Sequence, residues 1–144
     1  MRLAILISTF FHLGKIQVFP GTIASLATLI LWNFISLDSF LIRGIILLVI
    51  ILFAFISIKI SLPSFQEDDP QAIVIDEVVG MSIPLLFILD NIFISILAFI
   101  LFRILDILKP SIIYYSQSFE GAYGILMDDI LSGVITALII INYL

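Results

Sequence analysis

The stretch GIILLVIILFAFISI, residues 44–58, decides the fold class of this chain. It contains no charged residue, and it lies between the two cations Arg43 and Lys59. Its apolar residues run without period-2 alternation, which disfavours a half-buried strand. A bilayer also admits no open sheet, because every backbone polar group there must be satisfied within the protein. The stretch therefore predicts a helix in a membrane.

Further apolar runs divide the rest of the chain. They cover residues 3–11, 23–37, 78–89, 92–102 and 130–144. All of them are shorter than the ~20 residues that cross a bilayer comfortably, so flanking residues must extend them, and the first run is short enough to lie at the interface. We predict an all-α, polytopic helical membrane protein with about five hydrophobic helices, or four if 78–89 is re-entrant. The chain has no internal repeat or linker, so we expect residues 1–144 to form a single domain.

The composition agrees with a bilayer environment. Hydrophobic residues make up 62% of the 144 residues and charged residues only 12%, against about a quarter in a typical soluble domain. This disfavours both a free soluble monomer and a disordered chain. The net charge of −5 gives no basic face for nucleic acid. The absence of cysteine excludes disulfides, thiolate metal sites and cysteine nucleophiles.

The charges predict an orientation in the membrane. If all five longer runs cross, residues 1–22, 59–77 and 103–129 share one side, which holds five of the six cations. The positive-inside rule makes that side cytoplasmic. The same side holds nine of the eleven acids, which contribute little to orientation and need another explanation. We therefore expect one active site at the cytoplasmic face.

Two pairs of acids precede apolar runs on this face, and each pair is followed by a glycine one helical turn later. The pairs are Asp76-Glu77 before Gly80 and Asp128-Asp129 before Gly133. One such pair can simply complement a helix dipole. Two pairs on one face, with glycines that let another helix or a ligand approach, suggest a shared metal site instead. Its hard oxygen ligands would suit Mg²⁺ or Mn²⁺.

Arg103, Asp106 and Lys109 are spaced i, i+3, i+6 and form one charged stripe on a helix that Pro110 ends. One interpretation is a salt-bridged helix end whose long side chains reach the interface. The other is that Asp106 joins the metal site while Arg103 and Lys109 bind an anion such as a phosphate. The residues alone leave both open.

Two further polar segments lie on the same face. Pro20-Gly21-Thr22 predicts a turn into a helix, with Thr22 as its N-cap. Because a helix N-terminus also attracts phosphate, Thr22 and the upstream Lys15 are candidate phosphate-binding residues. Residues 67–69, all acidic, are interpreted as a solvated loop, although they can also join the site.

These motifs occur in a fixed order along the chain. They are Pro20-Gly21-Thr22, then Asp69-Pro70 with Ile73-Val74-Ile75-Asp76-Glu77-Val78-Val79-Gly80, then Phe102-Arg103 with Asp106 and Lys109-Pro110, then Gly124-Ile125-Leu126-Met127-Asp128-Asp129 with Gly133. In this order and spacing they resemble the phosphatidylglycerophosphatase A family, from about residue 8 to the C-terminus. The chain departs from the family pattern at Ala24, Ile112 and Ser132, where glycine, proline and alanine are expected, and none of these departures removes a charged group.

The resemblance implies a Mg²⁺-dependent lipid phosphatase in a bacterial cytoplasmic (inner) membrane. Such an enzyme removes the terminal phosphate of phosphatidylglycerophosphate to give phosphatidylglycerol, a step of phospholipid biosynthesis. Carried over by match, the catalytic and metal-binding acids would be Asp76, Glu77, Asp106, Asp128 and Asp129. Arg103 and Lys109 would bind the substrate phosphate. No cofactor beyond the ion and no nucleic acid is implied.

Two other classes compete with this interpretation. A small ion-transport or proton-transport subunit would also hold carboxylates within a helical membrane protein, but we would expect them at mid-helix, spread through the bilayer. A structural subunit gives no reason for paired acids on one face. The sequence does not indicate an oligomer.

Overall fold

The computed structural model describes residues 1–34, 39–67, 69–88, 91–110, 113 and 120–143, and within this part of the chain it contains helices and no strand. The predicted all-α fold class is therefore confirmed. The α-helices are α1 (Arg2–Ser8), α2 (Pro20–Phe34), α3 (Phe40–Ser61), α4 (Ile75–Phe87), α5 (Ile92–Leu108) and α7 (Ala122–Tyr143), with short 3-10 helices η1 (Leu13–Lys15) and η2 (Leu62–Ser64). Asp68, the middle acid of residues 67–69, and Ile112 lie outside the described residues.

Each predicted apolar run corresponds to one of these helices. Two segments, Phe40–Ser64 and Ala122–Tyr143, are long and apolar enough to cross a membrane. The outer surface of α3 is apolar along its length, with side chains such as Leu41, Leu48 and Leu52 more than half exposed. The number of crossings stays a prediction.

Two predicted helix starts are wrong. The last helix begins at Ala122 and not at residue 130, so Asp128 and Asp129 lie about two turns inside it. Residues 122–127 are themselves mostly apolar, which lets the helix continue through the acids. Helix α2 begins at Pro20, whose fixed φ suits the first turn of a helix, so Thr22 lies within that turn and is not the N-cap.

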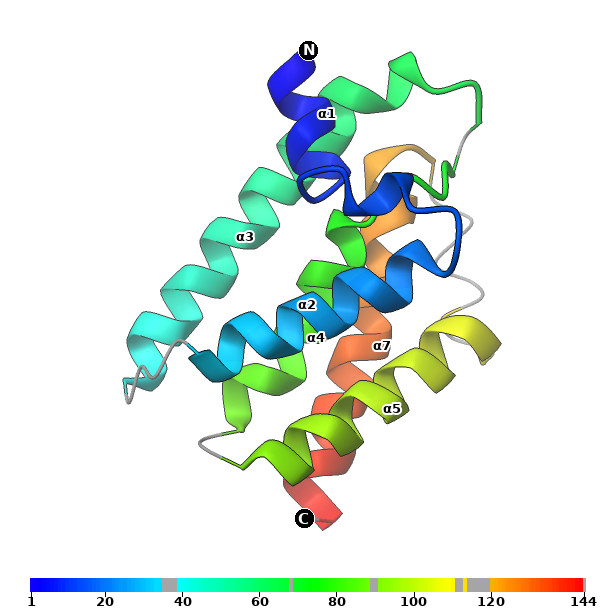
Figure 1. Cartoon of the computed structure of the whole chain (residues 1–144). Helices are drawn as coiled ribbons and strands as arrows, with labels where there is room; N and C mark the ends of the chain where they lie inside the picture. Colours follow the sequence, from blue (N-terminus) through cyan, green and yellow to red (C-terminus); the bar gives the residue numbers. More distant parts are fainter. Residues whose placement is uncertain (35–38, 68, 89–90, 111–112, 114–119, 144) are drawn as a thin grey trace.

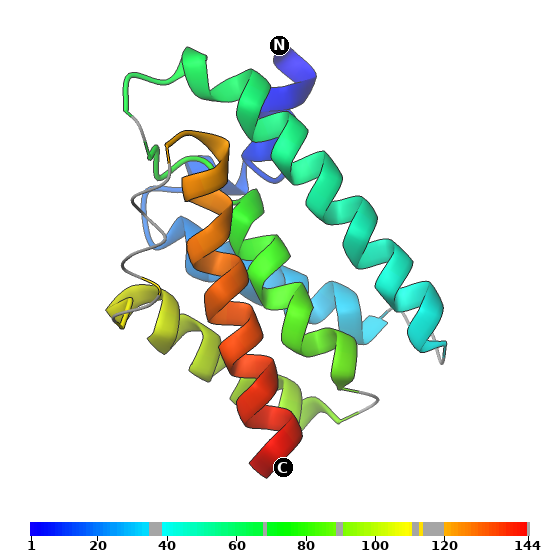
Figure 2. The same cartoon turned by 180° about the vertical axis from the view of Figure 1, so that it is seen from behind.

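Helices α4 and α7 lie side by side through the middle of the molecule in both views (Figures 1 and 2). Helices α2 and α5 lie together on one face of this pair, and α3 lies along its edge. The N-terminal ends of α4 and α7 point toward the same end of the molecule (Figure 1). Because the two helices run side by side in the same direction, the first turn of α4, with Asp76 and Glu77, lies near the second turn of α7, with Asp128 and Asp129.

Glycines bring the backbones of α4 and α7 into direct contact. A Cβ at Gly133 would overlap the carbonyl group of Gly80, and a Cβ at Gly80 would lie 2.7 Å from both the carbonyl oxygen of Asp129 and the ring of Phe102. The Gly80 carbonyl is also released from the usual helical bond, because Pro84 has no N–H to donate. The expectation that these glycines allow close approach is confirmed.

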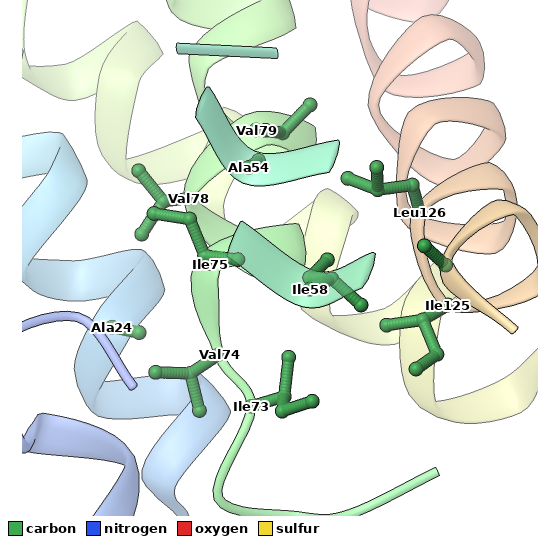
Figure 3. Packing of buried hydrophobic residues seen from close by; sticks show 11 residues of the cluster. Ala24, Ala54, Ile58, Ile73, Val74, Ile75, Val78, Val79, Ile125 and Leu126 are labelled. Atoms are coloured by element: carbon green, nitrogen blue, oxygen red, sulfur yellow. The ribbon is translucent and has the colours of Figure 1, made fainter. Parts of the chain in front are cut away.

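An apolar cluster fixes the start of α4 between α3 and α7 (Figure 3). Ile75 and Val79 of α4 pack in one cluster with Ile58 of α3 and with Ile125 and Leu126 of α7, and all five side chains are buried. Burying side chains of this size stabilises the fold by roughly 1.5–3 kcal/mol each. The first turn of α4 is therefore held in place on its apolar side.

Hydrogen bonds around Ser8 hold the segment that leads into α4. The hydroxyl of Ser61, at the end of α3, donates to the hydroxyl of Ser8 at 2.9 Å. The backbone N–H of Val74 donates to the carbonyl of Ser8 at 3.0 Å. Nearby, a Cβ at Gly14 would overlap the carbonyl of Ala72. The N-terminal segment thus fixes where the chain enters α4.

We predict that Gly133→Ala destabilises the protein by about 1–3 kcal/mol, the usual effect of forcing a methyl group into a packed interior. The new Cβ meets the backbone carbonyl of Gly80, which cannot rotate away as a side chain could. Thermal unfolding of the purified protein in detergent measures this change. The matched control is Gly44→Ala in α3, where a Cβ meets nothing within 4 Å, so stability should stay the same or rise slightly. Equal melting temperatures for the two variants would contradict the close contact.

Candidate active site

Three buried or half-buried carboxylates from two helices converge on one point. Asp76 and Glu77 lie in the first turn of α4, and Asp129 lies in α7 beside Gly80. Each of the three carboxylates contributes one oxygen to a group in which all three oxygens lie within 4.8 Å of one another. Asp76 and Asp129 are 7% and 3% exposed, so water screens their charges little.

The other two predicted acids lie at the edge of this cluster. Asp106, near the end of α5, is close enough to interact electrostatically with Glu77 and Asp129. Asp128 interacts in the same way with Asp76 and Asp106. The structure therefore brings all five predicted acids into one region.

The two predicted cations each pair with one of these edge acids. The guanidinium of Arg103 donates to Asp106 at 2.7 Å along α5, and the ammonium of Lys109 donates to Asp128 at 2.5 Å between α5 and α7. Lys109 ends α5 in a left-handed conformation, with φ at 43°, which ends the helix at this residue. Burial alone would lower the pKa of Lys109, but its hydrogen bond to Asp128 and the negative charges around it hold that pKa above its ordinary value.

The inner carboxylates keep oxygens that the described part of the protein leaves without a partner. Asp76 Oδ1, Glu77 Oε2 and Asp129 Oδ1 are buried and have no hydrogen-bond donor among the described residues. Leaving an ionised group buried and unpaired costs several kcal/mol, and coordination of a metal ion is one of the ways proteins offset that cost. Three hard oxygens of this kind fit a divalent cation such as Mg²⁺ or Mn²⁺. The three carboxylates are thus suited to bind a metal ion.

The N-terminal end of α2 lies against the cluster. A Cβ at Gly21 would overlap the carboxylate of Glu77, so any other residue here would force that carboxylate to shift. The next residue, Thr22, is half-buried and lines a groove together with Arg103. Lys15 is exposed and lines a separate hollow with Arg2 and His12. The structure thus brings Thr22 to the site, whereas the role of Lys15 stays a prediction.

Asp69 belongs to the acidic segment that was predicted to be a solvated loop, with the alternative that it joins the site. Asp69 is exposed, as expected, but it is near enough to Asp76 and Asp128 to act on both electrostatically. The neighbouring Pro70 is buried, and its carbonyl accepts a hydrogen bond from Ile73 at 2.9 Å, which folds the loop back toward α4. The sequence signal for this position of Asp69 was the Asp69-Pro70 pair, which comes shortly before Asp76 in the chain. Glu67 is exposed and stays in the predicted loop.

The family model described as phosphatidylglycerophosphatase A matches residues 6–143. No solved structure matches the chain.

Three curated relatives cover most of the chain. A protein of Bacteroides thetaiotaomicron, whose name proposes a phosphatidylinositol-3-phosphatase, is 37% identical over 96% of this chain and 91% of its own length. The phosphatidylglycerophosphatase A of Escherichia coli is 34% identical over 92% of this chain and 78% of its own length. That of Haemophilus influenzae is 34% identical over 94% of this chain and 85% of its own length. On the family match and these relatives, the chain belongs to the phosphatidylglycerophosphatase A family and is a lipid phosphatase.

Proposed function

We propose that this protein hydrolyses the phosphate monoester of phosphatidylglycerophosphate to phosphatidylglycerol and inorganic phosphate, with Mg²⁺ as its cofactor. The observation that carries the proposal is the group of three carboxylates, Asp76, Glu77 and Asp129, each of which has one buried oxygen with no hydrogen-bond donor among the described residues. Two cations lie near enough to act on this group electrostatically, Arg103 on Glu77 and Lys109 on Asp129. The family supports a phosphatase that acts on this lipid. The reaction belongs to phospholipid biosynthesis.

In this proposal the inner acids and the edge acids have different roles. Asp76, Glu77 and Asp129 would hold the ion, which supplies counter-charge to the phosphate oxygens and makes a bound water more acidic. Asp106 and Asp128, which we also predicted as metal-binding acids, here act as positioning residues. They hold Arg103 and Lys109 in place.

The two cations would bind the phosphate that is to be removed. Arg103 offers further N–H donors beyond the one it gives to Asp106, and Lys109 offers further ammonium protons. Both offset the negative charge that develops on phosphate in the transition state. Water adds to phosphorus, the bond from phosphorus to the glycerol oxygen breaks, and that oxygen leaves with a proton. One water is consumed for each phosphate released.

We further propose that the protein is a multi-pass protein of a bacterial cytoplasmic membrane, with the acid cluster at the cytoplasmic face. Two segments are long and apolar enough to span, and α2, α4 and α5 would complete the crossings with help from flanking residues. Five of the six cations fall on the cytoplasmic side of this arrangement. A cytoplasmic site would receive the lipid from the inner leaflet.

The relatives suggest one alternative substrate. The name of the Bacteroides relative proposes an inositol lipid with a phosphate at position 3, whereas those of the other two relatives specify phosphatidylglycerophosphate. Both lipids carry a phosphate monoester on the headgroup of a diacyl phospholipid, so the same carboxylates and cations would serve either. An ion-transport role fits less well, because the acids lie toward one end of α4 and α7 and are not spread along the length of helix that would cross the bilayer.

We predict that the purified protein releases inorganic phosphate from phosphatidylglycerophosphate when Mg²⁺ is present, and that a chelator stops this release. The reason is that Asp76, Glu77 and Asp129 need a cation before they can accept an anionic phosphate. Phosphatidylinositol 3-phosphate, assayed in parallel, should be the poorer substrate. Absence of phosphate release from either lipid, together with proton flux into liposomes, would support a transport subunit instead.

We predict that Asp129→Asn lowers phosphate release by more than ~100-fold, on the scale of removing one well-placed electrostatic group. The amide keeps the shape of the side chain but removes one of the three charges that would hold the ion. Thermal unfolding checks that the variant is folded, and Mg²⁺ should stabilise the wild type but not the variant. Glu67→Gln is the matched control, since Glu67 is exposed in the loop and should tolerate the change. A folded Asp129→Asn protein with near-full Mg²⁺-dependent activity would contradict the assignment.

A further inference from the structure

A groove runs between α2 and α5, on the face of the molecule where these two helices lie together (Figure 1). It encloses about 430 Å³. Its polar lining residues are Thr22 and Arg103, and Phe99, Ile100, Ile104 and Ile107 of α5 form its apolar wall. A cavity with this lining suits a molecule that has one polar end and one apolar end.

The polar end of the groove adjoins the carboxylate cluster. Arg103 is ion-paired to Asp106, and it interacts electrostatically with Glu77. Its Nε is buried and has no hydrogen-bond acceptor among the described residues. On the α2 side, Thr22 follows Gly21, which packs on the carboxylate of Glu77. An anionic group placed at Arg103 would therefore lie beside the proposed metal site, and charge complementarity favours its binding there.

The apolar part of the groove opens to the surroundings of the helix bundle. Ile100 and Ile104 are 46% and 47% exposed, and they lie on either side of Arg103 along α5. From Phe99 to Ile107 the wall follows eight helical rises, about 12 Å. In a bilayer, a hydrocarbon chain could lie along this wall without leaving the apolar layer.

A second groove, of about 320 Å³, lies between α2 and α3 and is more apolar. Its charged lining residue is Arg43, which donates to the carbonyl of Leu85 at 3.0 Å and lies over the ring of Trp32. Leu85 is near the C-terminal end of α4, whereas Asp76 and Glu77 are at its N-terminal end. A headgroup held at Arg43 would therefore be at the wrong end of the molecule for the acids.

We propose that the groove between α2 and α5 is the lipid-binding subsite of the enzyme. The phosphate-bearing headgroup lies at Thr22 and Arg103, and an acyl chain lies against Phe99 and Ile100. The lipid enters sideways from the membrane between the two helices. This inference rests on the proposed function, because it assigns the path by which that substrate reaches the acids. Ile100 is then a specificity-determining residue for the acyl chain.

The test compares two substrates that share one headgroup. One is phosphatidylglycerophosphate with long acyl chains, and the other is its deacylated, water-soluble headgroup. Ile100→Trp fills the groove one turn from Arg103. The quantity to compare is kcat/KM for the lipid divided by kcat/KM for the headgroup. This ratio should fall about tenfold, as expected when an apolar substrate group no longer fits its pocket. The loss should come mainly from a higher KM for the lipid.

Two control variants locate the effect. Ile96→Trp places the same side chain on the same helix at a residue that is similarly exposed, 44%, and does not line this groove. Val49→Trp fills the groove between α2 and α3. Both should leave the ratio unchanged.

An equal ratio for Ile100→Trp and Ile96→Trp would overturn the proposal, and so would a fall in the ratio for Val49→Trp alone. Activity of Ile100→Trp on the deacylated headgroup shows that the variant is folded, and complete loss on both substrates would also count against an acyl-chain role. If the wild type hydrolyses neither substrate, the proposed function itself has failed.

Discussion

The backbone contact between α4 and α7 at Gly80 and Gly133 determines how the acids of the site come together. Any side chain at either residue would meet main-chain atoms of the partner helix. Because the helices approach this closely, Asp76 and Glu77 of α4 reach the same point as Asp129 of α7. The same contact brings Phe102 of α5 against Gly80, so the third helix of the site is positioned by it too.

The charges of the site are balanced in two layers. At the edge, Arg103 and Lys109 neutralise Asp106 and Asp128 through direct ion pairs. In the interior, the inner carboxylates keep oxygens without any donor among the described residues. An arrangement that pairs the outer acids with cations and leaves one oxygen of each inner acid without a donor is costly for stability, and departures of this kind from local rules are expected at functional sites. The inner carboxylates are therefore suited to bind a metal cation that the protein takes up from solution.

The sequence predicted much of this site because its residues repeat a recognisable pattern. The acid pairs and the glycines one turn after them pointed to two helices in close contact, and the structure has that contact at Gly80 and Gly133. The start of α7 was predicted wrongly, because the prediction followed the uncharged run, which begins only at residue 130. The helix in fact begins at Ala122 and passes through Asp128 and Asp129. The pairing of Lys109 with Asp128, nineteen residues apart, could not be predicted, since it depends on how α5 and α7 are placed in space. The sequence left open whether Asp69 joins the site, because that depends on the turn at Pro70 that folds the loop back toward α4.

In the proposed enzyme, the approach of α4 and α7 builds a single cation site from carboxylates of both helices. Binding of Mn²⁺ to the purified protein, followed by electron paramagnetic resonance of the free ion, tests it most directly. We expect saturable binding that Mg²⁺ displaces. We also expect at least about tenfold weaker binding in a folded Gly133→Ala variant, since separating the helices by a fraction of an ångström disturbs a geometry that hard cations require. Wild-type protein that binds no divalent cation, or a Gly133→Ala variant that binds Mn²⁺ as tightly as the wild type, would contradict it.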